Sequence, residues 1–363
     1  MTAIRVEGLS KTFRTKTKAE GFGASLRGLV RPRWRSVDAV RGVDFEVEEG
    51  EVVAFLGPNG AGKSTTIKML TGILVPTSGR AEVLGIESAS RRARDRVRLA
   101  RSIGAVFGQK SQLWFHLPPS DSFRLLGAVY EIEPAPLARR KAELVERFGI
   151  ADYMDVPVRK LSLGERIRCE IAASLLHEPR VLFLDEPTIG LDVVVKREIR
   201  GLLEEAAKRD HVTIFLTSHD IGDIEKVCKR AIIIHHGAVI VDESMKELKH
   251  RALAKKFIGV KYTAPANLDL PGLKPLKRTE DAARFEIDTR VHRIEDVLRR
   301  LVERGEILDL TVEDESLENI IAEIFTSRSE EDARAASRAR PTSALGPGTD
   351  SGGGSSDEPG GAP

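Results

Sequence analysis

Hydrophobic residues in the first 240 positions fall into short apolar runs, separated by stretches in which apolar residues recur at helical spacing. We expect strands over Ile4–Gly8, Val43–Glu48, Glu51–Gly57, Ser102–Phe107, Val181–Asp185, Val212–Ser218 and Ala231–Ile234. Several of these runs are continuously apolar, which is typical of strands that are buried on both faces. Helices are expected over Ser64–Thr71, Leu137–Phe148 and Val194–Arg209. The pattern predicts an α/β fold with a largely parallel sheet.

A second, smaller unit is expected over residues 242–328, after a first domain that occupies residues 1–241. Its expected elements are strands at Phe257–Tyr262 and Ala283–Ile287, a helix at Val291–Val302 that ends at Gly305, a strand with Leu308, Leu310 and Val312, and a helix capped by Ser316. This order predicts a small α+β module. The last 20 residues hold seven Gly and three Pro, and Leu345 is their one large apolar side chain. We therefore expect residues 329–363 to be a disordered tail.

Composition narrows the class of protein. The 363 residues carry 57 Lys and Arg against 55 Asp and Glu, so the net charge of +2 does not favour direct binding of nucleic acid. Cys169 and Cys228 have neither metal-ligand spacing nor a disulfide framework, which fits a reducing compartment. The longest apolar runs are too short to span a bilayer, and the first residues lack a secretory signal. We expect a cytoplasmic chain.

The strongest motif follows the apolar strand at Val52–Leu56 and opens a helix. It consists of Gly57, Pro58, Asn59, Gly60, Ala61, Gly62, Lys63, Ser64 and Thr65, and it matches the phosphate-loop pattern G-x-x-x-x-G-K-[ST] in its required context. Small residues allow successive backbone N–H groups to surround phosphates at the start of a helix. We expect Lys63 to reach the β- and γ-phosphates and the Ser64 hydroxyl to bind Mg²⁺. The motif predicts ATP and Mg²⁺ as ligands without choosing among kinases, GTPases and transport ATPases.

Two adjacent acids end the apolar run at Val181–Leu184. Neighbouring strand residues point to opposite faces, so Asp185 and Glu186 are expected to have different tasks. Asp185 suits the Mg²⁺ site, because an acid at this strand end serves that role in phosphate-loop proteins. Glu186 is then placed to act as the general base on the attacking water.

A third motif comprises Leu161, Ser162, Leu163, Gly164 and Glu165, ahead of an apolar helix. With the two motifs above, it makes the chain resemble the nucleotide-binding subunit of ATP-binding cassette (ABC) transporters, whose signature is usually written L-S-G-G-Q. The resemblance implies a P-loop NTPase cassette with a RecA-like core and a helical subdomain. It also implies a head-to-tail dimer in which each signature binds the ATP held by the partner's phosphate loop. Leu163 and Glu165 depart from the usual Gly and Gln, which puts the hydrolysis rate in question.

Further positions match the family by their order along the chain. Gln109 resembles the Q-loop glutamine that contacts Mg²⁺ and water, Asp192 the D-loop aspartate at the dimer interface, and His219 the switch histidine at the γ-phosphate. Phe13 resembles the aromatic residue that stacks on adenine. Trp34 is an alternative for that place, and a core role for Phe13 is equally open.

Within the family, the sequence around Gln109 and Ser162 resembles that of ATPases of bacterial ABC-2-type exporters, including drug and viologen-like efflux systems. This implies an ATPase that powers transport through separate membrane permease subunits, as a homodimer or heterodimer, on the inner face of the cell membrane. The alternative is a soluble ABC ATPase that acts on ribosomes or DNA. The chain has a single phosphate loop, whereas ribosome-associated members usually carry two cassettes, and it lacks room for the coiled coils of chromosome-maintenance members.

Two surface features have open interpretations. The expected helical subdomain covers about residues 110–178 and begins with the apolar residues Trp114, Phe115 and Leu117. These three side chains form either an anchor for the permease or part of the local core. Residues 14–37 form a basic insertion with seven Lys and Arg and one Glu. Within it, Phe22, Leu26 and Leu29 lie on one face of a possible short helix. The insertion either docks on an anionic surface or is a solvated loop.

Overall fold

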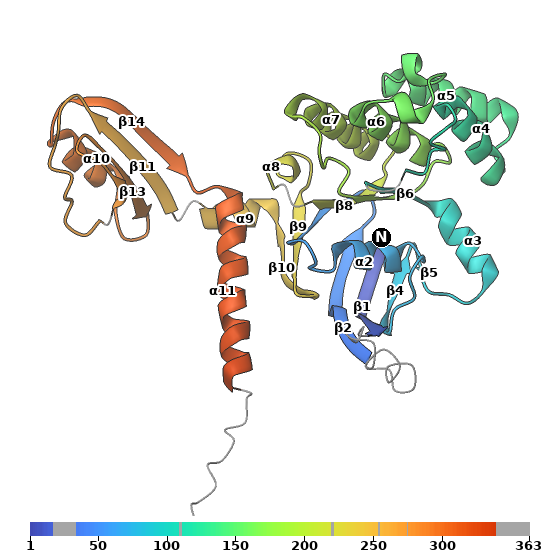
Figure 1. Ribbon diagram of the computed structural model, residues 1–363, viewed down its shortest axis with the longest axis horizontal. Helices are drawn as coiled ribbons and strands as arrows, with labels where there is room; N and C mark the ends of the chain where they lie inside the picture. Colours follow the sequence, from blue (N-terminus) through green and yellow to red (C-terminus); the bar gives the residue numbers. More distant parts are fainter. Residues whose placement is uncertain (17–33, 109–110, 219–220, 253–254, 274, 339–363) are drawn as a thin grey trace, which may run out of the picture. The chain divides into compact units, whose positions relative to one another are not determined.

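The structure is a computed structural model that describes residues 1–16, 34–108, 111–218, 221–252, 255–273 and 275–338 (Figure 1). Its central element is a six-stranded sheet in the order β10-β9-β3-β8-β7-β6. The strands are β10 (Ala238–Ser244), β9 (Arg230–His235), β3 (Val52–Leu56), β8 (Thr213–Ser218), β7 (Val181–Asp185) and β6 (Ile103–Phe107). All neighbours are parallel except β10, which runs antiparallel to β9. The parallel sheet expected from the apolar runs is confirmed.

A second, antiparallel sheet has the order β2-β1-β4-β5. It contains β2 (Trp34–Glu48), β1 (Thr2–Lys16), β4 (Ser78–Val83) and β5 (Ile86–Glu87). Side chains from this sheet, from α2 (Lys63–Leu70) and from the parallel sheet form one core cluster. The rings of Phe45, Phe55 and Phe215 meet in that cluster, with centroids 5.2–5.8 Å apart. The phosphate loop therefore rests on two sheets at once.

Pairing of β1 with β2 extends into the basic insertion. Arg14 lies opposite Ser36 and Lys16 opposite Trp34, so both ends of the 14–37 segment are strand rather than loop. The apolar pattern predicts a first strand that ends at Gly8 and a second that begins at Val43, because charged and polar residues interrupt the pattern between these two positions. The helix expected around Phe22, Leu26 and Leu29 lies outside the described residues.

The remaining helices of the cassette gather next to the parallel sheet (Figure 1). They are α3 (Ala93–Ser102), α4 (Pro119–Val129), α5 (Pro134–Arg147), α6 (Leu163–Ser174), α7 (Val193–Arg209) and α8 (Ile221–Ile224), with 3₁₀ turns at Ala151–Tyr153 and Val158–Lys160. Prolines at the first turns of α4 and α5 suit those positions, where the backbone N–H has no partner within the helix.

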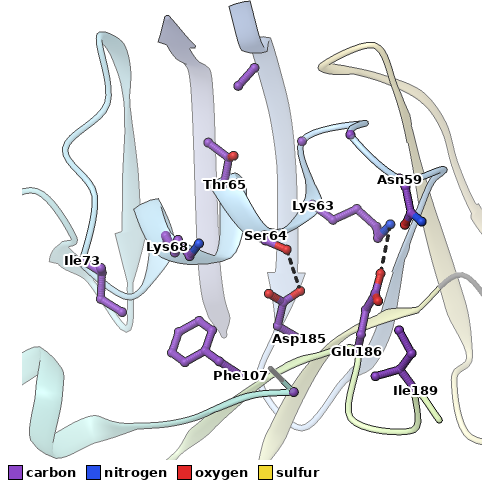
Figure 2. Close-up of a pocket in the computed structure, with 14 residues that line it drawn as sticks. Asn59, Lys63, Ser64, Thr65, Lys68, Ile73, Phe107, Asp185, Glu186 and Ile189 are labelled. Carbon is purple, nitrogen blue, oxygen red and sulfur yellow. Dashed lines mark hydrogen bonds and ion pairs between the residues drawn. The ribbon is translucent and has the colours of Figure 1, made fainter. Parts of the chain in front are cut away.

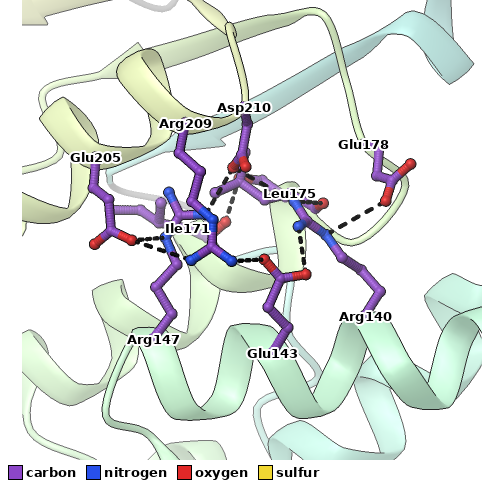
Figure 3. Close-up of polar contacts among 10 residues, drawn as sticks. Arg140, Glu143, Arg147, Ile171, Leu175, Glu178, Glu205, Arg209 and Asp210 are labelled. Carbon is purple, nitrogen blue, oxygen red and sulfur yellow. Dashed lines mark hydrogen bonds and ion pairs between the residues drawn. The ribbon is translucent and has the colours of Figure 1, made fainter.

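An ion-pair network joins α5 to the end of α7 (Figure 3). Asp210 accepts a 2.7 Å hydrogen bond from Nη1 of Arg147 and lies 3.6 Å from Nη2 of Arg140. The Arg147 side chain is only 4% exposed, and its Nε lies 3.2 Å from Glu205 on α7. Because a buried guanidinium requires charged partners, Glu205 and Asp210 at the end of α7 compensate the charge of Arg147 on α5.

The last third of the chain contains α9 (Met245–Ala252) and a four-stranded antiparallel sheet in the order β12-β13-β11-β14. Its strands are β12 (Pro275–Arg278), β13 (Ala282–Asp288), β11 (Lys255–Tyr262) and β14 (Ile307–Asp314), and α10 (Ile294–Val302) packs on one face. The expected α+β elements are present. The short strand β12 was not expected, because its Pro and basic residues give no apolar pattern.

The final helix, α11, spans Leu317–Arg338, and Ser316 accepts a hydrogen bond from the backbone N–H of Asn319 at its start, as expected. The helix continues past Ser329, where the disordered tail was expected to begin. The Glu-, Ala- and Arg-rich stretch before Arg338 has high helix propensity, which the composition of the last residues obscured. The chain divides into two units, residues 1–320 and 321–363, and this helix crosses the division. No helix in the described part of the chain combines the length and apolar character needed to cross a membrane.

Candidate functional site

The phosphate loop runs from the end of β3 to the start of α2. Gly62 precedes the helix with φ of 111°, and a Cβ at this position would lie 2.5 Å from the carbonyl oxygen of Ala39. Only glycine fits this close, left-handed backbone. The loop therefore presents the N-terminus of α2 to an open cavity, the arrangement that binds phosphate groups elsewhere.

Lys63 lies inside this loop and is only 5% exposed. Its Nζ donates to the carbonyl oxygens of Gly57 at 2.7 Å and Pro58 at 3.3 Å, and it lies 3.3 Å from Oε1 of Glu186. All three partners of the ammonium group are oxygen atoms. A phosphate oxygen in the cavity can therefore take the place of the Glu186 carboxylate beside Nζ.

Asp185 lies at the end of β7, where it is joined to the loop and to the neighbouring strand. Its Oδ1 accepts hydrogen bonds from the hydroxyl of Ser64 at 3.1 Å and from the hydroxyl of Thr217 at 2.8 Å. Thr217 is fully buried and also accepts a bond from the backbone N–H of Glu186 at 3.0 Å. Thr217 belongs to none of the sequence motifs, and the polar end of the apolar run Val212–Ser218 is the signal that could have indicated it.

Glu186 follows the strand in a left-handed conformation, with φ of 53°. Alternation within a strand predicts that Asp185 and Glu186 point to opposite faces. That expectation was wrong, because Glu186 lies past the strand end and its backbone turns, so both acids face the same cavity (Figure 2). Non-glycine residues in this conformation are strained and are concentrated at functional sites.

The cavity has a volume of about 550 Å³. Its lining combines the phosphate loop, the two acids and apolar side chains from several elements: Ala39, Asn59, Gly60, Gly62, Lys63, Ser64, Thr65, Lys68, Ile73, Phe107, Gly108, Asp185, Glu186 and Ile189. The volume falls in the range of small-molecule and cofactor sites. Basic groups and N–H donors on one side and two carboxylates on the other suit a triphosphate with a divalent cation.

The oxygen donors at this site fit Mg²⁺. The Ser64 hydroxyl and the Asp185 carboxylate are in direct contact, and hydroxyl, carboxylate and phosphate oxygens are the ligands that this hard cation prefers. The predicted third ligand, Gln109, lies outside the described residues, as does the predicted switch residue His219.

The signature segment begins α6 with a complete capping box. The Ser162 hydroxyl accepts from the backbone N–H of Glu165 at 3.3 Å, and the Glu165 carboxylate accepts from the backbone N–H of Ser162 at 2.7 Å. Glu165, which departs from the family's usual Gln, is thus engaged in stabilising the helix start. A Cβ on Gly164 would lie 2.7 Å from the Val195 side chain, so close packing against α7 requires glycine there.

Two other predicted residues are placed by the structure. Asp192 caps α7, where its carboxylate accepts from the backbone N–H groups of Val194 and Val195 at 2.9 and 3.0 Å. Phe13 lies on β1 with 38% exposure and has the ammonium group of Lys11 5.4 Å from its ring centroid. It is not among the residues that line the cavity, and its role in adenine stacking stays a prediction, as does the alternative at Trp34.

The apolar residues ahead of α4 are exposed. Trp114, Phe115 and Leu117 have relative exposures of 42%, 52% and 42%. They are therefore not part of the local core, which favours the first of the two interpretations that the sequence left open.

Comparison with known proteins agrees with this geometry. The profile of the ABC transporter family matches residues 40–189. The ABC transporter ATP-binding protein NatA of Bacillus subtilis (strain 168) is 34% identical over 212 residues, which cover 58% of this chain and 84% of NatA. The daunorubicin/doxorubicin resistance ATP-binding protein DrrA of Streptomyces peucetius is 35% identical over 222 residues, 61% of this chain and 65% of DrrA.

A solved structure shows the same fold. The structure of cbiO1 from Clostridium perfringens, described as part of the ABC transporter complex cbiONQ, superposes with a TM-score of 0.56 at 31% identity. The match covers 69% of this chain and 91% of cbiO1. The predicted P-loop ATPase cassette is confirmed, and the chain belongs to the ABC transporter family as an ATP-binding ATPase subunit.

Proposed function

We propose that this subunit hydrolyses ATP in a head-to-tail dimer and thereby powers an exporter through separate membrane permease subunits. The observation that carries the catalytic part is the convergence of Lys63, Ser64, Asp185 and Glu186 on one cavity (Figure 2). A cation, two carboxylates and a helix N-terminus supply what phosphoryl transfer to water needs, which is positioning and electrostatic stabilisation.

Each residue has a separate task in this proposal. Lys63 exchanges Glu186 for the β- and γ-phosphates, and the backbone N–H groups of the loop bind the remaining phosphate oxygens. Glu186, released from Lys63, accepts a proton from the attacking water. Thr217 holds Asp185 by its hydroxyl and orients the Glu186 backbone, so both carboxylates keep fixed positions. Ser64 and Asp185 would hold Mg²⁺, which neutralises phosphate charge when bound.

The second half of the site comes from the partner subunit in this proposal. The N-terminus of α6, with the Ser162 hydroxyl and the Gly164 N–H, offers donors suited to a γ-phosphate. Gln109, Asp192 and His219 keep the roles that the family resemblance implies, at the water and Mg²⁺, the dimer interface and the γ-phosphate, and Phe13 remains the candidate for adenine.

Two relatives support the exporter assignment, and one exposed apolar surface supports a contact with the permease. DrrA and the bacitracin transport ATP-binding protein BcrA of Bacillus licheniformis, the latter 35% identical over 218 residues, are named for drug resistance and bacitracin transport. Exposed Trp114, Phe115 and Leu117 supply apolar anchors of the kind found at the centre of interfaces, and we assign them to the permease. The subunit would then lie on the inner face of the cell membrane. No comparison favours the ribosome or DNA alternative.

Mixing two inactive variants tests the shared site. Ser162→Arg blocks one signature and Lys63→Ala one phosphate loop, so a heterodimer retains one intact composite site. We expect ATPase activity to return on mixing, and Ser327→Arg on the exposed surface of α11 serves as the matched control for the added charge. Full activity of an enforced monomer would refute the shared site.

Affinity purification from membranes tests the transporter part. We expect an integral membrane protein to co-purify with the tagged subunit and to be lost when Trp114 and Phe115 are replaced by Ser. Recovery with ribosomes or DNA, and without a membrane protein, would overturn the proposal.

A further inference from the structure

The sheet of the C-terminal module has two edges with opposite properties. β12 is four residues long and contains Pro275, Lys277 and Arg278, and proline and basic residues are features that prevent an edge strand from pairing with another chain. β14 at the other edge is eight residues long and contains neither proline nor a basic residue. Among the described residues it pairs only with β11, so one side of its backbone is open.

β14 also exposes apolar side chains. Leu310 and Val312 lie opposite Val260 and Ile258 of β11, which are core residues beneath α10. The two β11 residues are 3% and 0% exposed, whereas Leu310 and Val312 are 39% and 45% exposed. The core face of the sheet therefore continues onto β14 but is left uncovered there.

We propose that β14 pairs with β14 of a second copy of this chain, antiparallel and about a two-fold axis at Leu310, to form one continuous sheet across two modules. This contact goes beyond the ATP-dependent dimer of the cassettes and does not depend on it. Edge-to-edge addition satisfies the open backbone groups of both strands at once.

The sequence of β14 selects this register. With Leu310 opposite Leu310, Asp309 lies opposite Thr311 and Val312 opposite Leu308, which is the extra residue where β14 shifts register against β11, so no acids meet within the strand. A shift that centres the pair on Thr311 places Asp309 opposite Glu313 twice, and a shift that centres it on Asp309 places that residue opposite itself. Both arrangements put like charges together.

The remaining acids of β14 are neutralised within the module. Glu313 accepts from Arg284 at 2.9 Å, and Asp314 is paired with Lys256. The strand can therefore approach its own copy without a row of uncompensated negative charge.

A second copy suits this edge better than the chain's own C-terminal residues. Residues 339–363 contain one large apolar residue, Leu345, amid Gly, Pro and Ser, and cannot supply a matching strand. A second copy is present in any ABC motor that is a homodimer.

Disulfide cross-linking of the full chain without nucleotide tests the contact. The native Cys169 and Cys228 are buried and burial raises the pKa of both thiols to about 12, so they remain unreactive as background. Leu310→Cys places two thiols in directly opposed strand positions, about 4.5–5.5 Å apart between Cα atoms and within disulfide range. We expect about tenfold more covalent dimer than for Leu276→Cys on exposed β12, whose position is not in the contact.

Thr311→Cys checks the register. In the proposed pairing its two copies are diagonal neighbours, about 7–8 Å apart and beyond disulfide range. Cross-linking of Thr311→Cys at the level of Leu310→Cys would overturn the register. Equal yields for Leu310→Cys and Leu276→Cys, or a Leu310→Cys dimer that forms only with ATP, would overturn the contact itself.

Discussion

Replacing Glu186 with Gln separates the two tasks that the cavity assigns to this side chain. In the structure its carboxylate lies 3.3 Å from Nζ of Lys63, and in the proposed mechanism it accepts a proton from water. Gln keeps the size and a hydrogen-bond acceptor but has no negative charge and no basic oxygen. We therefore expect hydrolysis to fall while ATP binding becomes tighter.

The magnitudes follow from the geometry. Loss of a positioned general base lowers the rate by about 10²- to 10⁴-fold. The Lys63–Glu186 pair competes with phosphate for the ammonium group, and its side chains are 5% and 19% exposed. Because Gln still accepts a hydrogen bond, only the excess of a charged over a neutral hydrogen bond is lost, about 0.5–1 kcal/mol. This corresponds to an ATP affinity about 2- to 5-fold higher than in the unmodified protein.

Steady-state phosphate release measures turnover, and titration with a fluorescent ATP analogue at low Mg²⁺ measures affinity. Glu133→Gln, at an exposed position before α5, is the matched control and should change neither quantity. Turnover of Glu186→Gln within threefold of the unmodified protein would remove Glu186 from the role of general base. Weaker ATP binding would show that the carboxylate supports Lys63 instead of competing for it.

Three further substitutions test the surroundings of the site. Lys63→Ala should weaken ATP binding by at least about tenfold, because a charge-assisted contact to phosphate is lost, and unchanged affinity in the same titration would contradict the assignment of the loop. Asp210→Ala leaves the buried Arg147 with Glu205 as its one remaining ion-pair partner. We expect the free energy of unfolding, measured by urea denaturation, to fall by about 2–3 kcal/mol, which is less than the loss for a fully buried pair. An unchanged midpoint of urea unfolding would show that the network does not hold the subdomain. Ser162→Ala removes the cap of α6 and should cost about 1 kcal/mol by the same measurement, and a null effect would mean that Glu165 alone stabilises the helix start.

Local patterns in the sequence predicted most of what positions the phosphates. The phosphate loop, the strand before it and the acid at the end of β7 were identified because each signal is contained within a few consecutive residues. The continuous apolar runs likewise predicted the parallel strands, since burial on both faces leaves no polar position.

Other features depend on contacts between distant residues. Thr217 acquires its role because β7 and β8 are neighbours, with Asp185 directly opposite Thr217 in the parallel ladder. The sequence does not state which strands are neighbours, so a buried threonine at one strand end could not be assigned to an acid at another. The strands β4 and β12 were missed because their pairing partners, not their own composition, stabilise them.

The direction of the Glu186 side chain shows most clearly what local sequence patterns determine and what contacts between distant residues determine. Alternation along a strand is a local rule, and it placed Asp185 and Glu186 on opposite faces. The observed backbone at φ of 53° is unfavourable for a glutamate, and bonds from its N–H to Thr217 on another strand accompany it. The sequence alone determined which residue types carry the chemistry. The tertiary structure decided that they share one cavity, because the strained backbone of Glu186 is bonded to Thr217 on a neighbouring strand.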